Sequence, residues 1–382
     1  MSVGSGIASQ LVYLPETTYG LAPQTTPGTL NANSTLEFNS ETLELKKTTI
    51  QGQGLHAGGQ YDRALRRVLT DYQVAGGVVM DFQTRKMGNL IQAMVGSFGN
   101  TPATPVVTGV TGYTSVHAPA LGGFTGHSLC FQKGVPSTDG VVEPFTYVGC
   151  KITDWEIACA TGALAKLTLT IDGRNELNAS GNIALETGAF SGNSTNPGLV
   201  SYVNLPSDTS VFHFREASLV QGAVSVTSGT LAAGTMINAI GSTSPIANVT
   251  AASVKQTIGL ANNRFFFGNN GFKSEPIENV FRKLTGSMTA EFVSAEAMYA
   301  AYANDTKISL QLQFVGNVGI AGSTGPIYPT LTILIPAIYL EGEAPKVSGP
   351  GIVNTTVPFT GLDDQTNNPL QITYVTADNT LF

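Results

Sequence analysis

Histidine and cysteine are the side chains whose types and spacing would first indicate catalysis or metal binding. The chain has four histidines and three cysteines, which are His56, His117, His127, His213, Cys130, Cys150 and Cys159. No histidine has an acid or a cysteine at the spacing of a metal-ligand pair, and the cysteines form no CxxC motif. We therefore expect surface or core histidines and buried reduced thiols, with no metal site and no cofactor.

Acidic and amide oxygens are concentrated in GLDDQTNNP, residues 361–369. Calcium prefers such oxygens, but the segment lacks the alternating ligand positions of an EF-hand loop, so a polar turn is predicted. The sequence contains no G-x-S-x-G, H-E-x-x-H or Walker phosphate-loop motif. Paired carboxylates can meet in space without a sequence signature, which leaves a β-fold hydrolase as an alternative. The favoured prediction is that the protein is not an enzyme.

Charge is concentrated in one segment, QYDRALRRVLTDYQ, residues 60–73. One interpretation is a solvated turn. The other is a loop that pairs with another subunit, because arginine forms bidentate bonds to carboxylates in a fixed geometry. The candidate inter-subunit contacts are Arg63, Arg66, Arg67, Asp62 and Asp71.

The composition indicates a β-rich protein. Only 12% of the 382 residues are charged, 42% are hydrophobic, and glycine is abundant. The formal net charge of −7 provides no basic surface for specific DNA or RNA binding. No basic segment precedes a long apolar core at the N-terminus, and no apolar run is long enough for a membrane span, so we expect neither export by a signal peptide nor membrane association.

Two stretches about two hundred residues apart have the same pattern. They are AGGVVMDFQTRKMGNLIQAMVGS, residues 75–97, and TGSMTAEFVSAEAMYAAYANDT, residues 285–306. Each has alternating apolar residues and then apolar residues at helical spacing, with Thr84 or Ser294 between them as the expected helix cap. A shift of 210 places Asp81 on Glu291. We predict a strand followed by a helix in each, with helices near 84–97 and 294–305.

A second correspondence lies downstream, between ATGALAKLTLTIDG, residues 160–173, and SGPGIVNTTVPFTG, residues 348–361. Both alternate apolar and polar residues. Repetition of this order indicates a duplicated structural unit. The predicted division is an N-terminal arm at 1–34, a first domain at 35–184, a linker at 185–209, a second domain at 210–362 and a C-terminal tail at 363–382. Residues 217–254 carry no charge, so they are expected to pair with a neighbouring strand or another chain.

Three segments carry a resemblance to a known family. They are YLPETTYGLAP, residues 13–23, the stretch 36–97, and FTYVGCKITDWEIACATGALAKLTLTIDGRNE, residues 145–176. They resemble the tail tube (major tail) proteins of bacteriophages with long, non-contractile tails, the siphophages. The resemblance implies a mainly β fold of two tandem tail-tube-like β-sandwich or barrel domains, each with one flanking α-helix, plus extended arms and loops.

The same resemblance implies a structural virion protein whose rings stack into a tube that conducts double-stranded DNA as non-specific cargo. A polar and acidic lumen would let phosphates slide past, and its candidate lining residues are Asp81, Ser287, Thr289 and Glu291. Six tube domains per ring would require three copies of a two-domain chain; the alternative is six copies. The resemblance also implies tape measure, tail-terminator and distal tail proteins as partners, and assembly in the host bacterial cytoplasm.

Assembly is expected to use protruding elements, which are the arm at 2–33, the arginine-bearing loop at 52–70 and the tail after Gly361. A carbohydrate-binding, decoration or adhesion β-protein of the virion is the alternative function. Such a protein should expose clustered aromatic residues, whereas the only tryptophan, Trp155, lies in an alternating strand.

Overall fold

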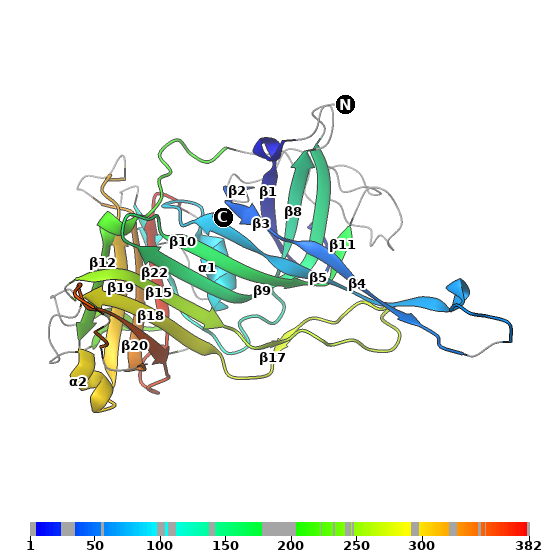
Figure 1. Ribbon diagram of the computed structural model, residues 1–382. Coiled ribbons are helices and arrows are strands. Elements are labelled where there is room, and N and C mark those ends of the chain that lie inside the picture. The colour runs from blue at the N-terminus through cyan, green and yellow to red at the C-terminus, as the bar shows by residue number, and fades with distance from the viewer. Residues whose placement is uncertain are drawn as a thin grey trace.

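Antiparallel strands dominate the chain, as predicted (Figure 1). The computed structural model describes residues 5–23, 35–54, 57–97, 104–105, 112–136, 142–177, 204–222, 224–231, 234–240, 246, 248–291, 298–320, 327–342, 345–347 and 349–379. Its elements are η1 (Gly6–Ala8), β1 (Gln10–Glu16), β2 (Thr35–Leu36), β3 (Ser40–Glu41), β4 (Glu44–Gln51), η3 (Ala64–Arg66), β5 (Arg67–Asp81), α1 (Gly88–Val95), β6 (Thr104–Pro105), β7 (Tyr113–His117), β8 (Ser128–Pro136), β9 (Val142–Ala160), β10 (Lys166–Gly173), β11 (Asn175–Leu177), η5 (Phe214–Glu216), β12 (Ala217–Gly222), β13 (Val224–Leu231), β14 (Gly234–Ile240), β15 (Val249–Thr257), β16 (Leu260–Ala261), β17 (Ile277–Glu278), β18 (Lys283–Glu291), α2 (Met298–Ala303), β19 (Ile308–Val315), β20 (Thr330–Leu340), β21 (Asn354–Gly361) and β22 (Gln371–Thr376).

One row of strands forms the backbone of the fold. Its hydrogen-bonded order is β4-β5-β10-β9-β15-β18-β21-β20, and every neighbouring pair is antiparallel. The first half of β9 leaves this row and pairs with β8 and β11, while β8 pairs with β1. On the far side, β20 pairs with β19 and β22. The described strands do not close into a barrel within one chain.

Alternation of side chains explains why these segments form sheet. In β10, Leu167, Leu169 and Ile171 are buried, whereas Lys166 and Thr168 point to the opposite, exposed face. A shift of one residue would expose the apolar set, so burial of one face fixes the register. Most of the buried hydrophobic residues belong to a contiguous cluster that includes residues from Leu11 to Tyr374.

The pairing order repeats along the chain. In the first half β5 pairs with β4 and β10, and β10 pairs with β9; in the second, β18 pairs with β15 and β21, and β21 pairs with β20. Lys166 lies opposite Asp81, and Asn354 lies opposite Glu291. The two sequence shifts, 210 and 188, therefore superpose every residue pair of β5–β10 on a pair of β18–β21.

One glycine in each half supports this correspondence. A Cβ on Gly76 would lie 2.3 Å from the carbonyl oxygen of Thr42, and a Cβ on Gly286 would lie 2.3 Å from that of Ser253. These distances are far inside van der Waals contact, so both positions require glycine for the same close approach of backbone. The shift of 210 that superposes Gly76 on Gly286 thus has a structural reason.

Both predicted helices are present, but the cap prediction was wrong for the first. Helix α1 begins at Gly88, and Met87 precedes it without a side-chain cap. The chain turns first at Lys86, whose φ is +66°, and the Thr84 hydroxyl instead accepts a hydrogen bond from the Ser210 N–H at 2.9 Å. Helix α2 spans Met298–Ala303; Ser294, its predicted cap, lies outside the described residues.

Two segments that we expected to protrude are instead part of the sheets. Within the predicted arm, β1 pairs along its whole length with β8, and Leu11, Val12 and Tyr13 are buried. After Gly361, β22 lies between β20 and β7, and Asp378 accepts a hydrogen bond from the Lys86 N–H. β1 is a continuous apolar run, and β22 buries Ile372 and Tyr374, so burial of these residues outweighs the turn-rich surroundings of both strands. Residues 24–34 and 178–203 lie outside the described part of the chain, and the second range includes most of the predicted linker at 185–209.

The uncharged stretch pairs with neighbouring strands, one of the two possibilities expected. Strand β12 pairs with β19, β13 and β14 form a hairpin, and β15 lies between β9 and β18. Both edges of β15 are covered, and a strand covered in this way needs no charge to prevent unwanted pairing.

Candidate assembly surfaces

The strand row has one apolar and one polar face, and the polar face carries the four candidate lining residues. Residues directly opposite in neighbouring strands share a face. One such line is Asp81, Lys166, Ala158, Ser253, Ser287. Thr289 and Glu291 follow Ser287 at alternate positions of β18 and therefore lie on the same face. The structure thus brings Asp81, Ser287, Thr289 and Glu291 onto one side of a single continuous sheet.

Hydroxyl groups and mixed charges cover this polar face. The Thr289 and Thr356 hydroxyls are 2.9 Å apart, and the Ser253 and Ser287 hydroxyls are 3.1 Å apart. Between the line through Asp81 and the ends of β15 and β18, this face carries the acidic residues Asp81, Asp154, Glu156 and Glu291 and the basic residues Lys166, Lys255 and Lys283. The face is therefore polar with nearly balanced charge, less acidic than the net charge of the chain suggests.

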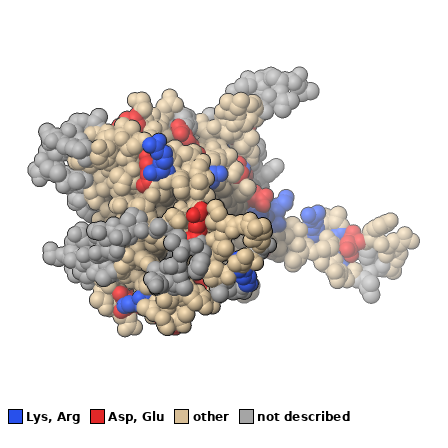
Figure 2. Space-filling model, turned by 60° about the vertical axis from the view of Figure 1, so that its left-hand side comes forward, with Lys and Arg blue, Asp and Glu red and all other residues tan. Residues whose placement is uncertain are grey.

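The arginine-bearing segment forms the outer end of a long hairpin. Strands β4 and β5 run out of the body together, and η3 lies at their tip (Figure 1). Figure 2 shows basic and acidic side chains along this projection, while much of the described body surface in that view is neither. The five predicted contact residues, Asp62, Arg63, Arg66, Arg67 and Asp71, all lie on it, and no ion pair within the described residues involves them.

Apolar side chains are also exposed on this hairpin. Leu65 is 99% exposed, and Tyr61, Ile50, Val68 and Leu69 also present large hydrophobic side chains to solvent. An exposed apolar cluster with charges around it is typical of a protein-binding surface. We refer to residues 50–69 as the hairpin tip.

The second half of the chain has a counterpart that projects less far from the body (Figure 1), residues 262–282 between β16 and β18, which we call the phenylalanine loop. Phe267 is 109% exposed, and Phe266 and Phe281 are also exposed. The loop lies against the hairpin: the Tyr72 and Phe272 rings stack with centroids 5.4 Å apart, and the Tyr72 N–H donates to the Gly271 carbonyl at 3.0 Å. We did not predict this loop. The run RFFFG at 264–268, with three consecutive phenylalanines, was the sequence feature that could have indicated it.

Two buried lysines attach the phenylalanine loop to the body. Lys273 and Asp172 form an ion pair at 2.5 Å, and Lys151 and Glu275 form one at 2.6 Å. Burial lowers the pKa of Lys273, which Asp172 opposes, and burial raises the pKa of Asp172, which Lys273 opposes. Each charge needs its partner because an unpaired charge at this depth is costly.

His117, the three cysteines and the acidic turn near Asp364 all lie in structural positions. His117 is buried between the hydroxyls of Ser97 and Ser115, at 3.0 and 3.1 Å, and burial lowers its pKa to about 3. All three cysteines are buried and free, and burial raises the thiol pKa of each. In the predicted turn, Asp364 accepts hydrogen bonds from the backbone N–H groups of Thr366 and Asn367.

Metal-binding groups and membrane-spanning helices are absent from the residues that the structure describes. Among them, no group of three or more His, Cys, Asp or Glu could hold a metal ion. No helix within the described ranges is both long and apolar enough to cross a membrane. His56 lies outside the described residues.

A comparison with protein families gives one match. A family model described as phage tail tube protein matches residues 6–361 of the chain. The match includes both copies of the repeated strand order, the hairpin tip and the phenylalanine loop. No curated protein matches the sequence significantly.

Proposed function

The chain belongs to the phage tail tube protein family, and from that premise we propose that it polymerises as stacked rings whose lumen conducts double-stranded DNA. Family membership makes it a structural component of the virion tail and implies self-assembly into a tube. The observation that carries the finer proposal is the repeated strand row, which has one apolar and one polar face and no closure within the chain. Such a sheet can close only against other copies.

We place the polar face of the row toward the lumen. Its hydroxyls and balanced charges offer DNA little to bind, because non-specific affinity comes mainly from basic groups that release counterions. The negative net charge of the whole chain adds a long-range repulsion that salt screens. Asp81, Ser287, Thr289 and Glu291 are the proposed lining residues. Lys166 lies directly opposite Asp81, and Lys255 and Lys283 share the same face.

The proposed ring contains three chains. Each chain supplies two units with the same pairing order, so three chains provide six equivalent positions, as we infer for this family. The proposed division follows the predicted boundaries: units at 35–184 and 210–362, joined by a linker at 185–209. Six chains per ring, with the second unit as an elaboration, is the competing arrangement.

Stacking of rings is assigned to the hairpin tip and the phenylalanine loop. They occupy the same place in the two units, between equivalent strands, and both expose large apolar side chains. Arg63, Arg66, Arg67, Asp62 and Asp71 would then pair with charges of the next ring. We further propose a siphophage tail, assembly in the host cytoplasm, and contacts with tape measure, tail-terminator and distal tail proteins.

Electron microscopy of the purified protein tests this proposal. We expect hollow tubes whose averaged cross-section has threefold symmetry with sixfold pseudo-symmetry. Strict sixfold symmetry, with one whole chain in each repeat, would show that the ring contains six chains and would contradict the three-chain ring. Protein that stays monomeric or forms closed globular particles, at any concentration and salt tried, would contradict the tube itself.

A further inference from the structure

Lys273 and Asp172 form the most deeply buried ion pair among the described residues. The Lys273 side chain has no exposed surface, that of Asp172 is 10% exposed, and Nζ lies 2.5 Å from Oδ1. The two residues are 101 positions apart in the chain, Lys273 in the phenylalanine loop and Asp172 on β10. An amine and a carboxyl group held in contact away from water are the two reactants of an amide bond.

The Lys273 ammonium has fewer acceptors than its three N–H donors can use. Among the described residues, its hydrogen-bond partner is Asp172 Oδ1 alone. The second buried lysine differs, because Lys151 Nζ donates to Glu275 Oε1 and to the carbonyl oxygens of Phe124 and Pro276. Three acceptors stabilise an ammonium, whereas a single acceptor at this depth favours the neutral amine.

The Asp172 carboxylate is also incompletely paired. Its Oδ1 accepts the hydrogen bond from Lys273, whereas Oδ2 is buried and has no hydrogen-bond partner in the described part of the chain. A buried carboxylate oxygen without a donor is costly. Loss of Oδ2 as water would remove this unpaired atom.

Backbone hydrogen bonds hold both reactants in place. On either side of Lys273, the N–H groups of Phe272 and Ser274 donate to backbone carbonyls at 2.8 Å each. Asp172 lies in β10, which pairs with β5 along one edge and with β9 along the other. Two groups that are fixed in contact react far faster than the same groups free in solution.

We propose that Lys273 and Asp172 condense after folding to an amide bond between their side chains. The neutral amine Nζ attacks Cγ of the protonated carboxyl group, and the Cγ–Oδ2 bond breaks. Oδ2 leaves as water, with one proton from the carboxyl group and one from Nζ. Transfer of one proton within the ion pair supplies both neutral groups, so the step balances without any further reactant.

Burial favours both neutral reactants. It lowers the pKa of Lys273 and raises the pKa of Asp172, and the opposite charge of the partner opposes each effect. The amide product carries no charge, so the bond also ends the cost of holding two charges at this depth.

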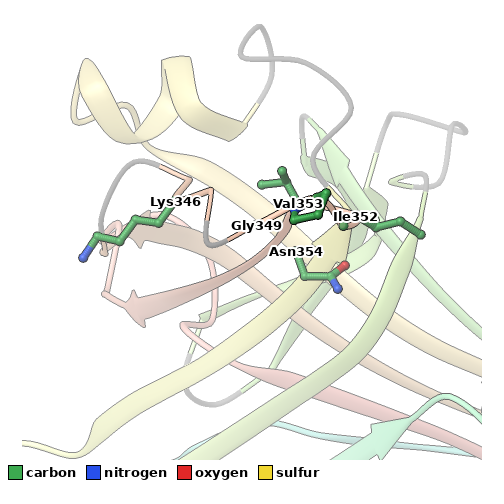
Figure 3. Close-up of a pocket in the computed structure, with 7 residues that line it drawn as sticks. Lys346, Gly349, Ile352, Val353 and Asn354 are labelled. Atoms are coloured by element: carbon green, nitrogen blue, oxygen red, sulfur yellow. The ribbon is translucent and has the colours of Figure 1, made fainter.

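The other lysines lack one or more of these conditions. Glu275, the partner of Lys151, is 23% exposed, and its Oε1 also accepts a hydrogen bond from the Gly126 N–H. Lys346 is exposed, and Figure 3 shows its side chain extending away from Ile352 and Asn354 beside an open hollow. Lys151 and Lys346 should therefore keep free amines, and both serve as internal controls.

The bond would attach the phenylalanine loop covalently to β10. An ion pair weakens when either group changes its protonation, whereas an amide does not, so the loop would stay attached over a wide range of pH. The ion pair is the precursor of the bond. Stability comparisons of the two charges therefore apply to freshly folded chain that still has the full mass of its sequence.

Mass spectrometry of the unfolded chain tests the proposal. After incubation of the folded protein, we expect a mass lower than that of the sequence by one water molecule. Proteolysis should give one branched peptide that joins the segment containing Lys273 to the segment containing Asp172. Acetylation of free amines in denaturant should modify Lys151 and Lys346 but leave Lys273 unmodified.

Loss of water alone does not identify the bond, because Gly173 follows Asp172. A cyclic imide between these two neighbours would have the same mass. The branched peptide and the unreactive Lys273 distinguish the amide from the imide. Loss of water with a fully acetylated Lys273 would mean the imide and would overturn the proposal.

Two variants complete the test. Lys273→Arg keeps the positive charge but has no amine, so its chain should keep the full mass. Asp172→Asn should form the same branched peptide with loss of ammonia instead of water. A folded wild-type chain that keeps its full mass, and whose Lys273 is acetylated as readily as Lys346, would contradict the bond.

The outcome is separate from that for the tube. Both residues belong to one chain, and the mass is measured on that chain whether or not it has assembled. A branched peptide in protein that forms no tubes would support the bond and contradict the proposed function, and tubes of full-mass chains would do the reverse.

Discussion

Buried ionisable side chains are the most costly residues of this fold and act in opposite directions as pH changes. Burial lowers the pKa of His117 to about 3 and raises that of Glu16 to about 7. Glu16 accepts hydrogen bonds from Ser128 and from the N–H groups of Gly20 and Gly149, which partly oppose the effect of burial. Its stabilising contribution is complete below about pH 4.5 and is lost as pH rises through 7.

His117 should make the protein sensitive to acid. Its folded pKa of about 3 lies below the ordinary value of 6.5, so its stabilising contribution is complete above pH 6.5 and is lost as pH falls toward 3. Over that window the contribution falls by up to about 1.4 kcal/mol per pH unit. Urea unfolding at pH 7, 5.5 and 4 should show a smaller decrease for His117→Gln than for the wild type. Parallel pH profiles for the two proteins would contradict this role.

The Lys273–Asp172 ion pair should control attachment of the phenylalanine loop. Lys273→Met leaves a buried carboxylate without its partner, so we expect a loss of about 3 kcal/mol in the free energy of unfolding. Adding Asp172→Asn removes the uncompensated charge and should recover most of that loss. Denaturant midpoints of the two variants and the wild type measure the difference. Additive destabilisation in the double variant would mean that the two charges do not depend on one another.

At the scale of elements, periodicity predicted the strands that repeat. The alternation of residues 75–81 and 165–171 is strong because each strand buries one face, so β5, β10 and their counterparts followed from sequence. Helix α1 was predicted, but its start was not, because the chain turn at Lys86 is a tertiary effect. The positions of β1 and β22 were missed. A short strand has no local sequence signal that shows which distant strand it will pair with.

The hairpin tip should be required for stacking but not for folding. Leu65 is 99% exposed, so Leu65→Asp should change the free energy of unfolding by less than about 0.5 kcal/mol. Tubes should nevertheless fail to elongate, because a charge would be buried at the proposed contact between rings. Leu121→Asp, at a leucine that is 104% exposed on the body, is the matched control and should elongate normally. Long tubes from both variants would remove the hairpin from the stacking interface.

Deletion of the N-terminal segment should unfold the subunit. A loosely attached arm could be removed without that effect. Removing residues 1–16 takes away β1, whose Leu11, Val12 and Tyr13 are buried, and uncovers an edge of β8. We expect loss of cooperative unfolding, seen by circular dichroism, where a protruding arm would have left a folded subunit. Removing residues 1–8 spares β1 and serves as the control. A folded, cooperative 17–382 variant would show that the remaining sheet is self-sufficient.

At the scale of the whole molecule, sequence predicted the class and the repetition but not how the units join. β9 pairs with β15 although the two strands lie about a hundred residues apart in the chain. No feature of either sequence identifies the other as its partner. Polar alternation marks one face of a strand, and the four candidate residues do share a face; that this face lines the lumen stays a prediction. The phenylalanine loop was not, because exposed aromatic residues in a loop give no periodic pattern.

The unequal reach of the hairpin tip and the phenylalanine loop from the body (Figure 1) has a consequence for how one ring meets the next. In a three-chain ring, long and short projections alternate around the rim. A following ring then fits in three rotational settings, and the three settings halfway between would place long projections where short ones belong. In the proposed three-chain arrangement, each ring would therefore fix the rotational setting of the next, and the setting at one end of a tail would determine the setting at the other.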